Sequence, residues 1–195
     1  MSQKRPDYFS GGYYHIYNRG AHQHSIIREP ANFLFLLDRL KHYTSQLDLT
    51  LIAYCLMYNH YHFLVRQNGE QPAGLLPQRV FNSYSKAYNK RYTHSGTLFE
   101  DNYKIKQVQS TSYLLHLCRY IHINPVKDGF VSDPGDWLYS NYLEFIGQRP
   151  GTLYDPEFVR INFDTPANYR TFVFADLRAR DLPPEVRAYL DEIEA

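Results

Sequence analysis

Short stretches of the chain alternate apolar and polar residues, and this period of two is typical of β-strands. The longest apolar stretch, Leu51–Arg66 (LIAYCLMYNHYHFLVR), is interrupted by polar residues near its middle. We interpret this interruption as a turn near Tyr58–Asn59 that joins two strands. The pattern predicts strands at four places: Gly12–Arg19, Leu49–Tyr58, His60–Arg66 and the later part of Gly96–Val108.

Elsewhere apolar residues recur every three or four positions, which predicts amphipathic helices. The predicted helices are Pro30 to about Gln46, Gln78–Tyr92, Ser112–Asn124 and a short helix at Trp137–Ile146. Ser110 or Thr111 can cap the third helix. Because proline disfavours helical geometry in the residue before it, Pro125 predicts that this helix ends at Asn124.

After residue 146 the chain turns irregular, and capping residues or prolines suggest further helix starts. These lie at Asp155–Pro156, Thr165–Pro166 and Leu182–Pro183–Pro184. We therefore expect two parts, a main domain at 1–146 and a largely helical C-terminal appendage at 147–195.

Composition limits the class of protein. The chain has 195 residues, of which 44% are hydrophobic, so a folded domain is expected and global disorder is not. No apolar run approaches the roughly 18 residues of a membrane span, and the first residues do not resemble a signal peptide. Cys55 and Cys118 lie in apolar runs and are expected to be buried thiols in a reducing compartment. A cytoplasmic protein without a membrane is expected.

The net charge is only +1, so no strongly basic footprint for nucleic acid appears in the total. The chain carries 19 tyrosines and 12 phenylalanines. Such an excess can serve stacking on single-stranded bases or packing in the core, and composition alone does not choose. Tyr13, Tyr14 and Tyr17 of the first strand are candidates for either role.

Candidate chemistry begins with two histidines. Side chains alternate along a strand, so His60 and His62 share one face and could hold a divalent metal. The alternative is two ordinary polar residues on a solvent-facing surface. On the helix before Pro125, His116, Tyr120 and Asn124 lie one above another. Here the alternatives are a half-buried tyrosine and a helix-ending asparagine.

A basic side of the predicted helix Gln78–Tyr92 is a second candidate site. Arg79, Lys86, Lys90 and Arg91 have no acidic residue among them anywhere in Gln78–Ser95. A phosphate-facing surface and an ordinary solvated face both fit this pattern.

Several segments together resemble the single-tyrosine HUH transposases of the IS200 type, and more closely the REP-associated tyrosine transposases. The resemblance rests on YHIYNRG (14–20), LMYNHYHFLV (56–65), GTLFEDNYK (96–104), YIHINPVKDGFV (120–131), WLYSNY (137–142) and DPEFVRINF (155–163). It extends to about Phe174. The sequence departs from the family at Tyr58, where proline is common, at Tyr61, which is bulkier than usual, and at Asn102, where arginine is frequent.

The resemblance implies a fold and a chemistry. The fold would be α+β, an antiparallel sheet flanked by helices of the HUH or ferredoxin-like kind. His60, His62 and Asn124 would bind Mg²⁺ or Mn²⁺, a choice of metal that suits a mixed nitrogen and oxygen ligand set. Tyr120 would attack a phosphodiester and form a 5′-phosphotyrosine, leaving a free 3′-hydroxyl.

The implied partner is single-stranded DNA with a palindromic hairpin, which a monomer or a homodimer would cleave beside the stem. We expect phosphate contacts from six residues: Arg19, Arg79, Lys86, Lys90, Arg91 and Lys104. Two other functions stay open. One is a non-catalytic module that binds DNA or RNA hairpins, and the other is a metal-dependent phosphoesterase that uses activated water.

Overall fold

A computed structural model describes residues 5–176 and 187–188 of the chain. Its four strands form one antiparallel sheet in the order β2-β3-β1-β4. The strands are β1 (Tyr13–Arg19), β2 (Leu49–Leu56), β3 (His60–Gln67) and β4 (Lys104–Val108). Helix α1 (Pro30–Gln46) connects β1 to β2, and α2 (Leu75–Tyr92) connects β3 to β4. This βαββαβ order is the ferredoxin-like arrangement, and the expected α+β fold is confirmed.

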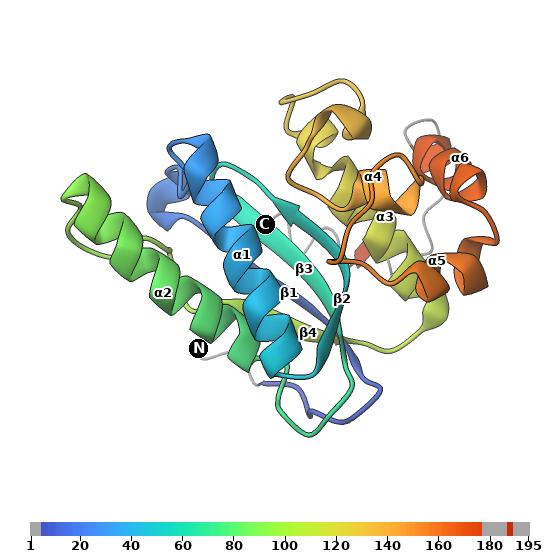
Figure 1. Ribbon diagram of the computed structural model, residues 1–195, viewed down its shortest axis with the longest axis horizontal. Coiled ribbons are helices and arrows are strands. Elements are labelled where there is room, and N and C mark those ends of the chain that lie inside the picture. Colours follow the sequence, from blue (N-terminus) through green and yellow to red (C-terminus); the bar gives the residue numbers. More distant parts are fainter. Residues whose placement is uncertain (1–4, 177–186, 189–195) are drawn as a thin grey trace.

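Helices cover both faces of the sheet (Figure 1). The first two, α1 and α2, lie side by side on one face. The opposite face carries α3 (Thr111–Lys127) together with α4 (Tyr142–Phe145), α5 (Pro156–Phe163) and α6 (Pro166–Asp176). Short 3₁₀ helices occupy Ala21–Gln23 and Pro134–Asp136. Within the described residues, no helix is both long enough and apolar enough to cross a bilayer.

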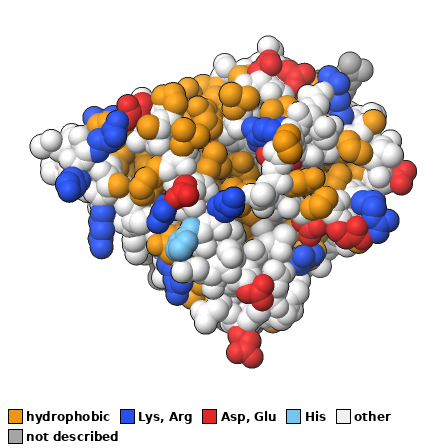
Figure 2. Space-filling view, viewed as in Figure 1, with side chains coloured by type: hydrophobic (Ala, Val, Ile, Leu, Met, Phe, Trp, Pro, Cys, Tyr) orange, Lys and Arg blue, Asp and Glu red, His pale blue; other side chains and the backbone are white. Residues whose placement is uncertain are grey.

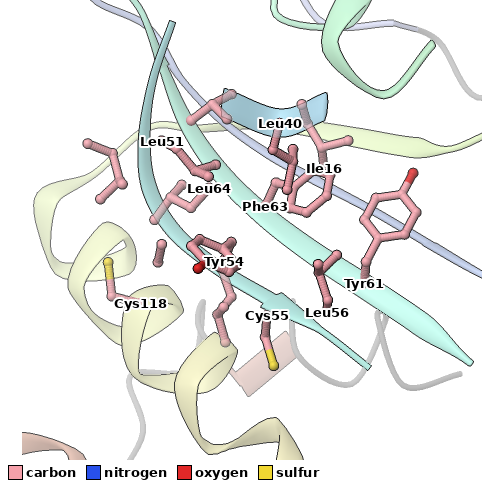
Figure 3. Packing of buried hydrophobic residues seen from close by; sticks show 14 of the residues in the cluster. Ile16, Leu40, Leu51, Tyr54, Cys55, Leu56, Tyr61, Phe63, Leu64 and Cys118 are labelled. Carbon is pink, nitrogen blue, oxygen red and sulfur yellow. The ribbon is translucent and has the colours of Figure 1, made fainter. Parts of the chain in front are cut away.

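The period of two in β3 divides the core between the two helical layers. Tyr61 and Phe63 face α1 and α2, and the Tyr61 ring stacks on Phe81 of α2 with centroids 4.1 Å apart. Figure 3 shows this apolar layer beside Leu40 of α1, with Cys118 of α3 on the other side of the sheet. Both Cys55 and Cys118 are free and buried, as the sequence predicts.

Proline is involved in two of the predicted helix boundaries that were wrong. Helix α2 begins at Leu75 and carries Pro77 in its first turn, where a missing N–H costs no internal hydrogen bond. Helix α3 does not end at Asn124 but continues through Pro125 to Lys127. Pro125 lies so close to the end of α3 that little of the helix depends on its missing donor. Its carbonyl accepts the Phe130 N–H at 2.9 Å, which closes the end of the helix.

The remaining helix starts largely follow the sequence. Ser110 caps α3 by accepting the Tyr113 N–H, and Asp155 caps α5 by accepting the Phe158 N–H. Pro166 begins α6, whereas only Tyr142–Phe145 is helical within the predicted stretch 137–146. The third predicted start, Leu182–Pro183–Pro184, lies outside the described residues.

The segment after residue 146 packs closely on α3. Tyr169 of α6 is fully buried, and its hydroxyl lies 2.5 Å from Nδ1 of His122. The ring of Phe145 lies 4.7 Å from that of Tyr169. The division of the chain at residue 146 into a domain and an appendage stays a prediction.

Candidate active site

A cleft of about 520 Å³ opens on the α3 side of the sheet, beside the ends of β1 and β3. Its walls come from both strands, from the loop before β4 and from α3. The lining residues are Tyr17, Asn18, Arg19, Gln23, Asn59, His60, His62, Glu100, Asp101, Asn102, Lys104, Tyr120, Asn124, Lys127 and Asp128.

The strand register brings the two histidines of β3 into this cleft. Tyr17 pairs with His62 and Arg19 pairs with His60 across the antiparallel ladder. Paired residues share a face of the sheet, so all four side chains point toward α3. The rings of His60 and His62 lie 5.2 Å apart, nearly perpendicular to each other.

The buried side of His62 is held by another histidine. Its Nδ1 lies 3.1 Å from Nε2 of His15 on β1. Burial lowers the pKa of His15 to about 3 and lowers the pKa of His62 well below the usual range. Both rings are therefore neutral near pH 7. If His62 donates from Nδ1 to His15, its Nε2 keeps a lone pair for a ligand.

His60 is held in a similar way at the rim of the cleft. Its Nδ1 lies 2.8 Å from Oδ1 of Asn59 and 4.0 Å from a carboxylate oxygen of Asp128. Burial lowers the pKa of His60, although Asp128 and a hydrogen bond with Asn124 oppose that shift.

Helix α3 supplies the phenol and the amide. The Tyr120 ring lies edge-on to His62, with centroids 5.5 Å apart and an interplanar angle of 83°. One turn later, Nδ2 of Asn124 donates to the Tyr120 carbonyl at 3.1 Å. This bond leaves Oδ1 of Asn124 with lone pairs that can accept a hydrogen bond or bind a cation. The Lys127 ammonium lies 4.9 Å from the centre of the Tyr120 ring.

The donor set fits a divalent cation. Two neutral imidazoles, each with Nδ1 already engaged, and one amide oxygen converge on one side of the cleft. Within the described residues no three side chains of His, Cys, Asp and Glu form such a group, and Asn124 is the amide that lines the cleft with the two histidines. Nitrogen and oxygen donors of this kind bind Mn²⁺ and, with bound waters, Mg²⁺.

The candidate phosphate contacts divide into two groups. Arg19 and Lys104 line the cleft, where Arg19 forms an ion pair with Glu100. The α2 residues Arg79, Lys86, Lys90 and Arg91 are exposed but do not line the cleft, since α2 covers the other face of the sheet. Arg91 also pairs with Glu29 at 2.6 Å, so an acid from another element partly balances the basic helix.

Of the three aromatic candidates on β1, one lines the cleft and two do not. Tyr17 lines the cleft and stacks on His15 with centroids 4.8 Å apart. Tyr14 is fully buried, and its hydroxyl donates to the Asp7 carbonyl, so it belongs to the core. Tyr13 is half-buried and does not line the cleft.

Sequence reasoning missed His15, Asn59, Lys127 and Asp128 as parts of the site. The parity of β1 does place His15 on the same face as Tyr17, but only the pairing with β3 brings it to His62. Asn59 adjoins His60 in the sequence and Asp128 follows Asn124 by four residues, and that proximity was the available signal. His116 and His122, on the same helix as Tyr120, do not line the cleft. His116 contacts Arg119, and His122 is fully buried between Tyr169 and Asn141.

Comparison with known proteins identifies the family. The family model described as "Transposase IS200 like" matches residues 8–124, well over half of the chain. This chain belongs to the IS200-like transposase family. The match includes β1–β4 and ends at Asn124, so all four candidate catalytic and metal-binding residues fall within it. No match was found among curated protein sequences.

Three solved structures are similar to this chain to different degrees. A REP-associated tyrosine transposase bound to a REP hairpin superposes with a TM-score of 0.65 at 18% identity, over 80% of this chain and 94% of that one. A putative transposase from Deinococcus radiodurans gives 0.42 at 17% identity, over 62% and 95%. The tRNA(His) guanylyltransferase of Saccharomyces cerevisiae gives 0.47 at 8% identity, over 88% and 75%. The first supports a shared fold, and the other two scores are too low to support any inference.

Proposed function

We propose that this IS200-like transposase cleaves and rejoins single-stranded DNA through a covalent bond to Tyr120. The observation that carries the proposal is that Tyr120, His60, His62 and Asn124 line one cleft. A helix and a strand hold these four side chains at fixed positions. A site built on such rigid elements keeps the geometry that in-line attack on phosphorus requires.

His60, His62 and Asn124 would hold Mg²⁺ or Mn²⁺, and their two imidazole nitrogens and one amide oxygen support this choice. When bound there, the ion would polarise the scissile phosphate and offset developing negative charge. The Tyr120 oxygen would form the new bond to phosphorus while the bond to the 3′-oxygen breaks. The phenol proton leaves to solvent and the 3′-oxygen gains one, so the phosphodiester is conserved and no external energy source is needed.

Cations beside the cleft would complete the site. Lys127, next to the Tyr120 ring, would offset charge on the phenol oxygen and the phosphate as the bond forms. Arg19 and Lys104 would contact phosphates on either side of the scissile bond. Arg79, Lys86, Lys90 and Arg91 remain proposed contacts for DNA that extends beyond the cleft, onto the α2 side.

The proposed substrate is a DNA hairpin with a single-stranded flank. The structural neighbour with the shared fold was solved bound to a REP hairpin, which supports this class of partner. Single strands expose their base faces, and the edge of the mostly buried Tyr17 ring lines the cleft wall.

A covalent-adduct assay tests the proposal. The protein is incubated with a labelled hairpin oligonucleotide and Mg²⁺ or Mn²⁺, and the adduct is separated on a denaturing gel. We expect an adduct with the natural sequence, none with Tyr120→Phe, and none after chelation of the metal. Tyr113→Phe is the matched control, because Tyr113 lies on the same helix but does not line the cleft.

Two results would contradict the proposal and favour one of the alternative functions. Cleavage that survives Tyr120→Phe without any adduct would indicate a phosphoesterase that uses water. Tight hairpin binding with no cleavage under any metal condition would indicate a non-catalytic binding module.

A further inference from the structure

Two exposed aromatic rings lie just outside the cleft, and the proposed chemistry does not use them. Tyr58 is 40% exposed and Phe130 is 43% exposed. Their ring centroids lie 5.2 Å apart at 62°. Both rings rest on Trp137, which is only 6% exposed, at 5.5 Å and 5.6 Å. We call Tyr58 and Phe130, supported by Trp137, the aromatic shelf.

The two residues of the shelf lie in turns that backbone hydrogen bonds hold in place. The Tyr58 carbonyl accepts hydrogen bonds from the N–H groups of Ile26 and Ile27 at 2.7 Å and 3.0 Å. Phe130 follows α3 in a Schellman motif, in which its N–H donates to the Pro125 carbonyl and the Gly129 N–H donates to Val126. Below them, the Trp137 indole N–H donates to the Leu56 carbonyl at 3.0 Å. The rings are therefore held in place before any ligand binds.

The shelf is continuous with the proposed catalytic cleft. Tyr58 immediately precedes Asn59, and Phe130 lies two residues after Asp128. Asn59 and Asp128 line the cleft, and both lie beside Nδ1 of His60. Along the chain, Asn59 lies between Tyr58 and His60, and Asp128 lies between Asn124 and Phe130. Figure 2 shows hydrophobic side chains gathered on this face, between α1 and the segment that follows α3.

We propose that the aromatic shelf stacks an unpaired nucleobase of the DNA strand, close to the scissile phosphate. A strand that reaches Tyr120 has to leave the cleft over its rim, and at Asn59 and Asp128 that rim leads onto the two rings. Unpaired bases stack on aromatic side chains with little dependence on sequence. Lys127, on the last turn of α3, supplies a positive charge for the phosphate of the stacked nucleotide. This inference rests on the proposed function, because it takes the cleft to be the DNA path.

Paired changes in protein and DNA test the shelf. Hairpin affinity is measured with chelator present, so that cleavage does not interfere, for the natural sequence, Tyr58→Ala and Phe130→Ala. Leu138→Ala is the matched control, since Leu138 is 58% exposed beside Trp137 but has no ring. The flank of the hairpin is then made abasic one nucleotide at a time.

We expect Tyr58→Ala to weaken binding by roughly 5- to 150-fold, the range that corresponds to the loss of one base–aromatic stacking contact. At one flanking position, the abasic substrate should weaken binding of the natural sequence by a similar factor. The same abasic substrate should bind to Tyr58→Ala almost as well as the complete hairpin does, because the stacking contact is already lost in this variant. Tyr58→Phe should bind normally.

The chain has a single tryptophan, so Trp137 reports directly on the shelf. Its fluorescence should change with the complete flank and change less with the abasic one. The inference is overturned if abasic substitution costs the variants as much as the natural sequence at every position. It is also overturned if the protein sediments as a dimer that Tyr58→Ala dissociates, because a second copy would then cover the shelf. The two proposals can also fail separately. If no covalent adduct forms but Tyr58→Ala and the abasic position still show the same shared loss of affinity, the proposed cleavage function is contradicted and base stacking on the shelf is supported.

Discussion

At the scale of single residues, the site depends on neighbours that hold the reactive groups. His62 cannot turn, because one ring nitrogen is engaged by the fully buried His15. A ligating imidazole held through its second nitrogen keeps its tautomer and its direction. We therefore propose that His15, which is fully buried, positions the His62 ring.

Replacement of His15 tests this role. We expect His15→Leu to weaken Mn²⁺ binding by about 10- to 100-fold, the usual effect of losing such a partner. His15→Gln keeps a hydrogen-bond acceptor and should retain most of the affinity. Titration calorimetry with Mn²⁺ measures the change, and His94→Leu, away from the cleft, serves as control. Equal affinities for His15→Leu and the natural sequence would contradict the role.

A second buried histidine should make stability depend on pH. Burial lowers the pKa of His122 in the folded protein to about 4, whereas an unfolded histidine titrates near 6.5. Between these values the unfolded state binds more protons, so stability is complete above about pH 6.5 and falls as the pH drops. We expect His122 to remove about 1.4 kcal/mol of unfolding free energy per pH unit in this window.

Urea unfolding at several pH values, compared between the natural sequence and His122→Gln, isolates this effect. The glutamine variant cannot take up the proton, so its curve should be flatter between pH 6 and about pH 4. Parallel curves for the two proteins would contradict the assignment.

At the scale of elements, the end of α3 decides the position of several site residues. The helix passes through Pro125 and ends in a Schellman motif with Gly129 at φ +73°. Tyr120 and Asn124 therefore lie within regular helix, one turn apart, and are not at a fraying end. The same motif fixes Phe130 of the aromatic shelf.

Gly129→Ala tests the importance of this ending. No atom obstructs a Cβ at this position, but the left-handed backbone costs a non-glycine residue about 1–2 kcal/mol. We expect a loss of that size in the free energy of unfolding, measured with urea. Gly129→Asn should lose less, because asparagine tolerates this conformation. An alanine variant as stable as the natural sequence would contradict the prediction.

At the scale of the whole molecule, one buried amide joins the sheet to the helices beyond it. Oδ1 of Asn141 accepts from the Tyr54 N–H and lies 2.8 Å from Nε2 of His122. Its Nδ2 donates to the carbonyls of Ile52 and Leu153. Strand β2, helix α3 and the segment before α5 thus share one fully buried side chain.

Removal of this amide should destabilise the fold. Asn141→Ala leaves several buried polar groups without a partner, each at a cost of about 1–3 kcal/mol, so we expect a total loss of at least about 3 kcal/mol. Asn162→Ala is the control, since its half-buried amide only bonds within α5. Thermal and urea unfolding measure both variants, and similar small losses would contradict the prediction.

The sequence by itself predicted the main strands and helices and nominated the candidate site residues. Alternation in β3 gave His60 and His62 one face, and helical spacing stacked Tyr120 over Asn124, because both periods are local properties of the backbone. The resemblance to IS200-type transposases was carried by short motifs and is confirmed by the family match. The continuation of α3 past Pro125 was not predictable from local preference, because hydrogen bonds beyond the helix end offset the missing donor.

Only the tertiary structure decided which distant residues meet. Strand pairing set His15 beside His62, and α3 packed on the sheet brought Tyr120 to the same ring. The tertiary structure also placed the basic face of α2 outside the cleft. It brought Phe130 beside Tyr58 as well. Contacts between residues tens of positions apart depend on register and layer order, which alternation and helical spacing do not encode.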